Sequence, residues 1–188
     1  MWQKLHYKIK GVSPLIMHNG RLANPMDPLV KQMKAVSGKR GKTDADFIEL
    51  ARLEWHGSLY ISDGKYVIPS QNIEATIVNG ARKIKKGVLF STGLICPEHV
   101  VLEFEHMHLQ PGALWEIEDY RLVAGVVISR SRVMRTRPIF REWAAEFDLN
   151  YQDTILNEAD ISQVLRKAGE EVGILDWRPK FGRFEVVS

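Results

Sequence analysis

The order in which hydrophobic patterns follow one another along the 188 residues is the feature that most limits the possible folds. Segments 69–86 and 157–173 have the spacing of amphipathic helices, with Gly87 and Gly173 as their expected ends. Strand-like alternation lies before, between and after them, at 2–12, 100–105, 122–129, 143–149 and 181–187. Reduced to its core, the order is strand, helix, strands, strand, helix, strand. It predicts an α+β fold with a ferredoxin-like (RRM-like) β-α-β-β-α-β core.

The remaining segments predict additions to a single domain that spans 1–188. An insertion at about 19–58 should be helical, and its polar, glycine-containing stretch at 37–42 should form a mobile basic loop. Because Asp63-Gly64 is a strong turn signal, 59–68 is expected to be a hairpin. The tract at about 120–141 is expected to form a second hairpin, extended as an arm.

Capping residues locate the helices of the insertion. Asp27 is suited to the N-cap of the first helix, and Pro28 to its first position. Thr43 can cap the second helix. The apolar face of that helix is expected to carry Phe47, Leu50 and Ala51.

Composition argues against a membrane protein and against a secreted one. No apolar run approaches the roughly 20 residues that span a bilayer, and the N-terminal residues lack the apolar core of a secretory signal. Cys96 is the single cysteine, so no internal disulfide can form, which is typical of a reducing cytoplasm. We therefore expect a cytoplasmic protein with no membrane partner.

The charges are segregated along the chain, although the net charge is only +3. Segment 98–119 carries six acidic residues and no lysine or arginine, whereas 120–141 carries six arginines and no acidic residue. Such blocks create local fields that a net charge conceals. Guanidinium groups bind phosphates and stack on bases, so the arginine tract indicates nucleic-acid binding. The alternatives are a solvated charged strand, or arginines that pair with the acidic segment.

Three basic sets, from the first strand, the basic loop and the arginine tract, are predicted to form one surface that follows a nucleic-acid backbone, and the loop before the last strand is a further candidate for binding. The exposed side of the first strand and the basic loop contribute Trp2, Lys4, His6, Lys8, Lys10, Lys39, Arg40 and Lys42. The arginine tract and the loop before the last strand contribute Arg130, Arg132, Arg135, Arg137, Arg141, Arg178, Lys180 and Arg183. An aromatic side chain such as Trp2 can stack on a base, which is worth roughly 1–3 kcal/mol. For the last loop, the alternative is a turn in which Trp177 packs on the core and Asp176 pairs with Arg178.

Several short motifs resemble the RAMP superfamily of CRISPR-associated proteins. They are Gly11-Val12-Ser13-Pro14-Leu15, Tyr66-Val67-Ile68-Pro69-Ser70 before a helix that ends in Ala81-Arg82, and the glycine-bearing loop before the last strand. The resemblance is to the backbone subunit that polymerises along guide RNA. It implies an RRM-like fold, an RNA partner and head-to-tail assembly into a homo-oligomer or filament. Segment 132–138 also resembles phage and prophage proteins, which implies a stand-alone phage protein in a bacterial host cell.

Catalysis has two candidate residues after the first strand. The resemblance implies a histidine base in RAMP ribonucleases, for which His18 is the candidate, and a loop aspartate in backbone subunits, for which Asp27 is the candidate. Both have simpler roles, His18 as a hydrogen-bonding loop residue and Asp27 as a helix cap. His106 and His108 share a strand face, but the spacing fixes no third ligand, so no metal site is predicted. No cofactor motif is found.

The main hypothesis is a non-enzymatic protein that binds single-stranded RNA or DNA through a basic groove and assembles along the strand. The first alternative is a metal-independent endoribonuclease that uses His18. The second alternative is a phage anti-defence protein that mimics a CRISPR subunit and binds a host protein.

Overall fold

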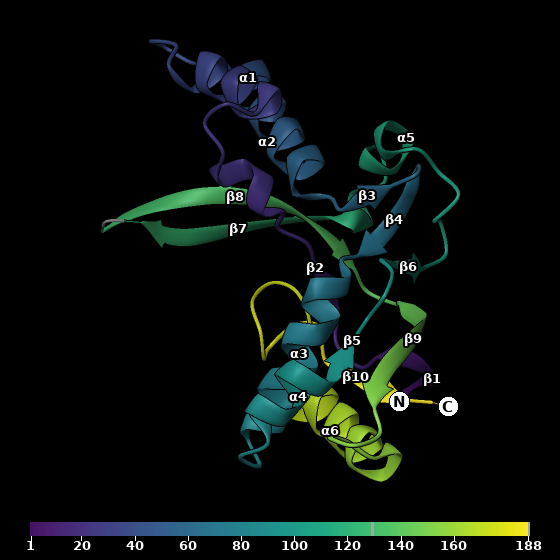
Figure 1. Ribbon diagram of the computed structural model, residues 1–188. Coiled ribbons are helices and arrows are strands. Elements are labelled where there is room, and N and C mark those ends of the chain that lie inside the picture. The colour runs from purple at the N-terminus through teal and green to yellow at the C-terminus, as the bar shows by residue number, and fades with distance from the viewer. Residues whose placement is uncertain (129, 188) are drawn as a thin grey trace. The chain divides into compact units, whose positions relative to one another are not determined.

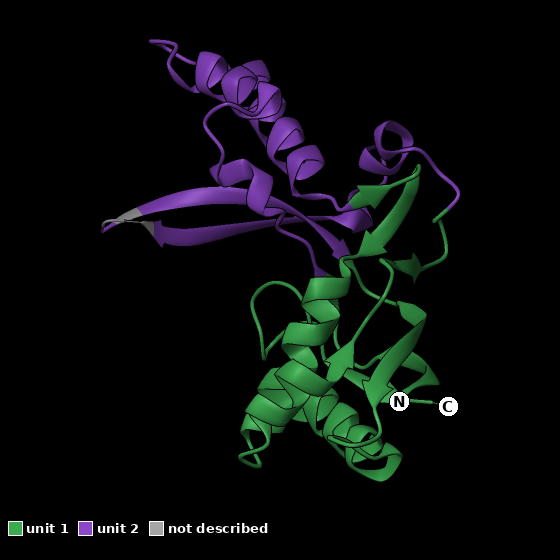
Figure 2. Ribbon diagram, viewed as in Figure 1, with its two compact units in different colours: residues 1–15, 61–107, 140–188 green, residues 16–60, 108–139 purple. Residues whose placement is uncertain are grey.

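The computed structural model describes residues 1–128 and 130–187, and it has a mixed α+β architecture with antiparallel sheets (Figure 1). The predicted α+β class is thus confirmed. The chain forms two compact units (Figure 2). The first contains Met1–Leu15, Ile61–Met107 and Phe140–Ser188, and the second contains Ile16–Tyr60 and His108–Ile139. The second unit is therefore built from two stretches that interrupt the first.

The first unit contains an antiparallel sheet in which β1 has a neighbour on each side. The strand order is β10-β1-β9-β6-β4-β3, and β5 also pairs with β9. The bounds are β1 Trp2–Gly11, β3 Ile61–Ser62, β4 Lys65–Ile68, β5 Leu94–Ile95, β6 Val100–Glu103, β9 Ala144–Gln152 and β10 Phe184–Val186. The pairing of β1 with β9 runs from Trp2 opposite Gln152 to Lys10 opposite Ala144. The first and last strands of the chain are neighbours, with Ile9 opposite Val186.

Helices α3 (Ser70–Arg82), α4 (Gly87–Gly93) and α6 (Glu158–Glu171) gather on one side of these strands (Figure 1). α3 and α6 approach closely because Gly80 has no side chain: a Cβ atom there would lie 2.8 Å from the Cβ of Ala168. The core of this unit includes the buried side chains of Ile9, Ile73, Ile77, Leu149, Ile161, Val164 and Leu165. Burial of these helical stripes against the strands is the main source of stability expected for such a layer.

The second unit combines a helical pair with a long β-hairpin. The pair is α1 (Pro28–Ser37) and α2 (Asp44–Ser58), preceded by the 3-10 helix η1 (Gly20–Ala23). The hairpin is formed by β7 (Arg121–Ile128) and β8 (Ser131–Phe140), and β2 (Leu15–Ile16) lies next to β8. The short helices α5 (Pro111–Trp115) and η2 (Glu118–Tyr120) precede β7. No helix in the described part of the chain is long and apolar enough to cross a membrane.

Most of the predicted local structure is confirmed. The strands expected at 2–12, 100–105, 122–129 and 143–149 correspond to β1, β6, β7 and β9, although Ser129 itself lies outside the described residues. The predicted caps Asp27 and Thr43 each accept a hydrogen bond from a backbone N–H in the first turn of the helix that they precede, and Asn157 does the same for α6. Asp63 and Gly64, with φ values of 50° and 74°, form the turn of the β3-β4 hairpin.

Two helix expectations are wrong. The helix expected at 69–86 ends at Arg82, because Lys85 adopts a left-handed φ of 62° and the N–H of Lys86 bonds back to the carbonyl of Ala81. Gly87 then begins α4 instead of ending a helix. In α2, Phe47 is 58% exposed, and the buried residues of the helix lie in its last turns, from Leu53 onward. The proposed apolar stripe is therefore wrong at Phe47, whereas Leu50 and Ala51 are half-buried.

Candidate nucleic-acid interface

The predicted contact residues of β1 face solvent beside carboxylates of β9. Lys4 Nζ lies 2.7 Å from Asp148 Oδ2, His6 Nδ1 lies 2.9 Å from Asp148 Oδ1, and Lys8 contacts Glu146. Hydrogen bonds from the two lysines hold the pKa of both carboxyl groups below its usual value. Also exposed on this strand are Trp2 and Lys10. This face therefore carries mixed charge, because β9 supplies acidic side chains next to the cations that the sequence pattern made prominent.

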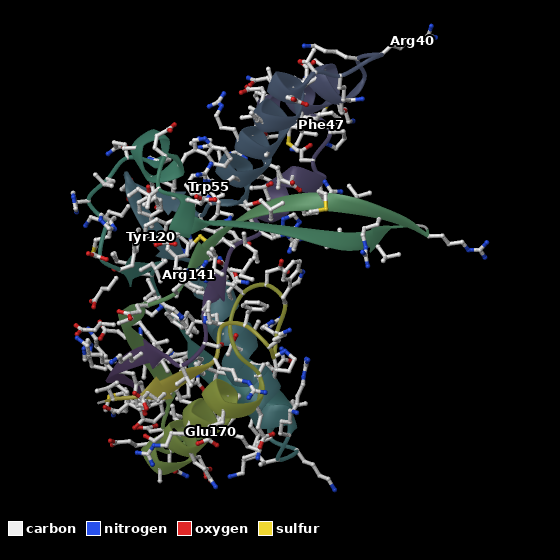
Figure 3. All side chains as sticks on the ribbon, turned by 180° about the vertical axis from the view of Figure 1, so that it is seen from behind. Arg40, Phe47, Trp55, Tyr120, Arg141 and Glu170 are labelled. Atoms are coloured by element: carbon white, nitrogen blue, oxygen red, sulfur yellow. The ribbon has the colours of Figure 1, made fainter. Side chains whose placement is uncertain are left out.

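The loop between α1 and α2 presents Arg40 to solvent (Figure 3). Lys39 Nζ lies 2.6 Å from Asp46 Oδ1, and this hydrogen bond is the main reason that the pKa of Asp46 falls to about 2. Lys42 Nζ donates to the carbonyl oxygen of Lys39 at 3.2 Å. Two of the three predicted loop cations thus take part in contacts within the loop and with the start of α2.

The distal part of the β7-β8 hairpin exposes both cations and apolar side chains. Arg130 and Arg132 are exposed, and Arg130 has a φ of 71°. A Cβ atom at Gly125 would lie 3.1 Å from Cδ of Arg132, so the absent side chain leaves room for the arginine stem to lie across the hairpin. The same face of the hairpin carries the exposed side chains of Val123, Val127 and Met134.

The proximal part of β8 holds the hairpin to α2. Glu54, which is 6% exposed, accepts hydrogen bonds from Arg135 Nη1 at 3.0 Å and from the N–H of Thr136 at 2.9 Å. Arg137 is 8% exposed, and burial lowers its pKa against the opposing effect of the Glu54 carboxylate. Of the predicted contact residues in the arginine tract, Arg135 and Arg137 therefore serve packing in the second unit. Arg141 lies after the end of β8 and is exposed (Figure 3).

Arg121, at the start of β7, also has a structural role. Its guanidinium carbon lies 4.9 Å from the centre of the Trp115 ring, which packs edge-on against Trp55 at 5.6 Å. Trp55 Nε1 donates to the carbonyl oxygen of Tyr120 at 2.8 Å (Figure 3). This cluster joins α5 and the start of the hairpin to α2. The carboxylate that pairs with Arg135 belongs to Glu54, which lies outside the acidic segment 98–119.

A cavity of about 680 Å³ in the first unit lies between the end of α3 and the loop before β10. Its lining includes Arg82 and Lys83 from α3 and its C-cap, and Trp177 and Arg178 from the loop. Arg82 Nη1 donates to the side-chain oxygen of Asn79 at 2.9 Å, which orients the guanidinium group. Cations and an indole ring thus border one concave surface.

Two carboxylates compensate a part of the positive charge that lines this cavity. Glu171 and Asp176 belong to the lining, and Lys83 Nζ lies 3.7 Å from Glu171. Lys83, Arg82 and Arg178 together carry three positive charges against these two negative charges. The excess of one positive charge favours an anionic ligand.

The loop that borders the cavity is held in conformations that most residues avoid. Leu175 and Trp177 have φ values of 62° and 54°, in the left-handed region. Gly182 has a φ of 72°, and a Cβ atom there would overlap the carbonyl oxygen of Ile174. Arg183 Nε donates to the carbonyl oxygen of Pro179 at 2.8 Å, so this arginine braces the loop. The other predicted cations of the loop, exposed in the structure, are Arg178 and Lys180.

His18 is half-buried in the second unit. Burial, together with the positive charge of Arg137, lowers its pKa, so the imidazole is neutral at neutral pH. Its Nδ1 is buried and has no hydrogen-bond partner among the described residues. A neutral imidazole is the form that a general base requires.

Asp27 is occupied by structural contacts. It accepts the N–H of Leu29 as the cap of α1, and Arg21 donates to both of its carboxylate oxygens at 2.9 and 3.2 Å. The hydrogen bonds from Arg21 are the main cause of its lowered pKa. Within residues 1–128 and 130–187, no group of three or more His, Cys, Asp or Glu side chains is placed to hold a metal ion.

The cavity residues Asn79, Arg82 and Lys83 were missed by the sequence reasoning. Cations at the end of a helix are favoured by the helix dipole, so their presence there does not by itself indicate a binding role. Only the fold brings the end of α3 against the loop at 175–179, which follows more than ninety residues later.

Comparison of the sequence with protein-family models and with curated proteins gave no match.

Proposed function

We propose that the protein binds single-stranded RNA or DNA, without cleaving it, through the cavity beside α3 and through the distal part of the hairpin. One observation carries this proposal: Arg82, Lys83 and Arg178 line the same cavity as Trp177. Guanidinium and ammonium groups bind phosphates, and an indole ring stacks on a base. A segment of nucleic acid offers both groups at neighbouring positions.

The hairpin supports the same proposal in the second unit. Arg130 and Arg132 are exposed on an element whose same face also exposes Val127 and Met134. Exposed apolar side chains beside cations favour a ligand that has both apolar and anionic surfaces. Bases and phosphates provide these surfaces.

The topology of the first unit favours a ferredoxin-like core, which we include in the proposal. In such a core, the last strand lies beside the first, and the first lies beside the third. The order β10-β1-β9-β6, with α3 and α6 as the two core helices, corresponds to this arrangement. On this interpretation, the second unit is inserted at two points of an RRM-like core. The resemblance to RAMP backbone subunits then extends the proposal to a phage-encoded protein that assembles head-to-tail along the strand.

The test is binding of labelled single-stranded oligonucleotides, RNA and DNA in parallel, followed by fluorescence anisotropy. The double variant Arg82→Ala/Arg178→Ala should weaken binding by about tenfold or more. It should also flatten the log–log salt dependence by about 0.7 for each phosphate contact that is lost.

The matched control is Lys4→Ala/Lys8→Ala. It also removes two positive charges, but from lysines that are ion-paired on β1, and it should change the affinity for the oligonucleotide by less than about twofold. Equal losses in both variants would assign binding to net charge alone, and no binding by the parent protein would end the proposal. Replacement of Arg135 and Arg137 is a poor test, because Arg135 pairs with Glu54 of α2 and Arg137 is buried.

A metal-independent endoribonuclease is the second candidate, favoured by the neutral His18 near the positive charges of Arg137 and Arg135. The chemistry would need His18 to accept a proton from a ribose hydroxyl group. Incubation of labelled RNA with the protein in the presence of a chelator tests it. If the parent protein cuts and His18→Ala cuts equally well, His18 is not the base.

A further inference from the structure

The turn after α3 borders a second pocket, next to the cavity that we propose for nucleic acid. This pocket has a volume of about 270 Å³ and is lined by Arg82, Lys85, Gly87, Val88 and Ser91. Arg82 also belongs to the lining of the cavity, so the two concave surfaces meet at this arginine. Both lie in the first unit, where α3 and α4 are side by side (Figure 1). A ligand that occupies the cavity can therefore extend into the pocket.

Arg82 is held in position at both ends of its side chain. A Cβ atom at Gly87 would overlap Cγ of Arg82, so the absent side chain makes room for the arginine stem. At the other end, Nη1 donates to the side-chain oxygen of Asn79 at 2.9 Å. None of the ion pairs in the described part of the chain involves Arg82. The guanidinium group is thus oriented before a ligand arrives, which lowers the entropic cost of binding.

Lys85 occupies a backbone position that usually belongs to glycine. The N–H of Lys86 donates to the carbonyl oxygen of Ala81, and the N–H of Lys85 donates to that of Arg82, which is the hydrogen-bond pattern of a helix end with a left-handed residue. The φ of Lys85 is 62°. Glycine adopts this conformation without steric cost, whereas a lysine is strained in it. The lysine side chain is exposed and takes part in no ion pair among the described residues, so its charge is available to a ligand.

The pocket differs from the cavity in its balance of charge. Among the described residues that line the pocket, only Arg82 and Lys85 are charged, and both are positive. The cavity has an excess of one positive charge, because Glu171 and Asp176 belong to its lining. A phosphodiester within a strand carries one negative charge, whereas a phosphate at the end of a strand carries nearly two at neutral pH. The charge of the pocket therefore matches that of a terminal phosphate.

The positive surface ends at this pocket. α4 follows directly, contains no charged residue, and exposes Val88 and Leu89. A strand that continued past the pocket along α4 would place its next phosphate beside these apolar side chains, where no cation compensates its charge. A strand that ends in the pocket leaves no phosphate in that position.

We infer that the pocket binds the terminal phosphate of a single-stranded nucleic acid whose neighbouring nucleotide lies in the cavity. This inference rests on the proposed function and specifies the class of strand as one with a phosphorylated end. Arg82 lies where it can contact the terminal phosphate and the nucleotide beside it, and Lys85 supplies the second positive charge. A 5′ phosphate and a 3′ phosphate share this chemistry, and the experiment distinguishes them.

The test uses one oligonucleotide sequence with three kinds of end: a 5′ phosphate, a 3′ phosphate, or hydroxyl groups at both ends. A fluorophore on an internal base leaves the ends free, and fluorescence anisotropy gives the affinity of the full chain for each form. The parent protein should bind one of the phosphorylated forms about fivefold or more tightly than the hydroxyl form. A methyl ester on that phosphate removes one negative charge and should reduce the preference to less than about twofold.

Variants of Lys85 locate the effect. Lys85→Gly should lose the preference for the phosphorylated end. It should keep or raise the melting temperature, because glycine suits the left-handed backbone at this position. Lys85→Arg keeps the charge and should keep the preference. The matched control is Lys65→Ala, which removes an exposed lysine from β4 and should keep the preference as well.

The possible outcomes separate this inference from the proposed function. Equal affinity of the parent protein for all three forms would overturn the inference, although nucleic-acid binding itself would stand. A preference that survives Lys85→Gly or the methyl ester would overturn it as well. Binding of none of the oligonucleotides would instead end the proposed function, and this inference with it.

Discussion

Glu54 is a buried carboxylate that connects two elements of the second unit. It accepts one hydrogen bond from the guanidinium of Arg135 and another from the backbone of Thr136. Removal of one partner of a buried ion pair is costly, because the remaining charge stays buried without compensation. A buried N–H that loses its acceptor adds to that cost. Glu54 therefore fixes how the hairpin sits on α2.

We expect Glu54→Ala to lower the free energy of unfolding by about 3 kcal/mol. Glu49→Ala is the matched control on the same helix, because Glu49 pairs with Arg52 at the surface. The control should lose less than about 1 kcal/mol. Urea denaturation of both variants measures the difference. Equal losses would show that the burial of Glu54 has no energetic consequence.

At the scale of elements, α6 and β10 meet through Gly169. Alanine in a helix interior is usually more stable than glycine by about 1 kcal/mol. Here a methyl group would overlap the carbonyl oxygen of Phe184, which belongs to the sheet and cannot move without disturbing β10. Steric overlap in a packed core typically costs about 1–3 kcal/mol.

We therefore expect Gly169→Ala to destabilise the protein and Gly112→Ala, in α5, to leave it unchanged or slightly more stable. At Gly112, a Cβ atom would meet no other atom within 4 Å. Thermal unfolding distinguishes the two variants by the sign of the shift in melting temperature. A rise for Gly169→Ala would mean that helix propensity outweighs the contact with β10.

The sequence predicts best the structural features that depend on residues close to one another in the chain. The caps Asp27 and Thr43 and the Asp63-Gly64 turn act through neighbours a few residues away, so they could be placed without knowledge of the fold. The packing face of α2 could not be placed in this way, because Trp55 is buried by Trp115 and by residues near Tyr120, far along the chain. Pattern reasoning chose Phe47 instead, which lies in solvent.

The candidate site was predictable only in part, for the same reason. The basic alternation of β1 is real, but the carboxylates that neutralise Lys4 and Lys8 come from β9, about 140 residues later. The cavity beside α3 combines residues near 80 with residues near 177, and of its lining only Arg178 was among the predicted contact residues. Which cations remain available for a ligand is a property of the tertiary structure.

At the scale of the whole molecule, two histidines make stability depend on pH. Burial is the main cause of the lowered pKa of both His18 and His56. In the unfolded chain, each takes up a proton as the pH falls through about 6.5, whereas the folded chain binds it only at lower pH. The unfolded chain then holds more protons, so the free energy of unfolding falls as the pH decreases below about 6.5.

Urea denaturation at a series of pH values between about 7.5 and 5 tests this dependence. The double variant His18→Gln/His56→Gln should have a flatter profile than the parent protein over that range. Asp46→Asn serves as a control that acts in a different pH range, because the pKa of Asp46 is lowered to about 2. Its contribution is lost only as the pH falls from about 4 toward that value. A parent profile that is flat between pH 7.5 and 5 would contradict the histidine effect.

The placement of β1 between β9 and β10 has a consequence for biosynthesis. The two strands that cover its edges, Ala144–Gln152 and Phe184–Val186, are made more than a hundred residues after β1. Throughout translation, the apolar side chains of Tyr7 and Ile9 emerge without the sheet that will bury them. Until β9 and β10 have been made, these apolar side chains are therefore exposed to aggregation, because the sheet of the first unit cannot close without those strands.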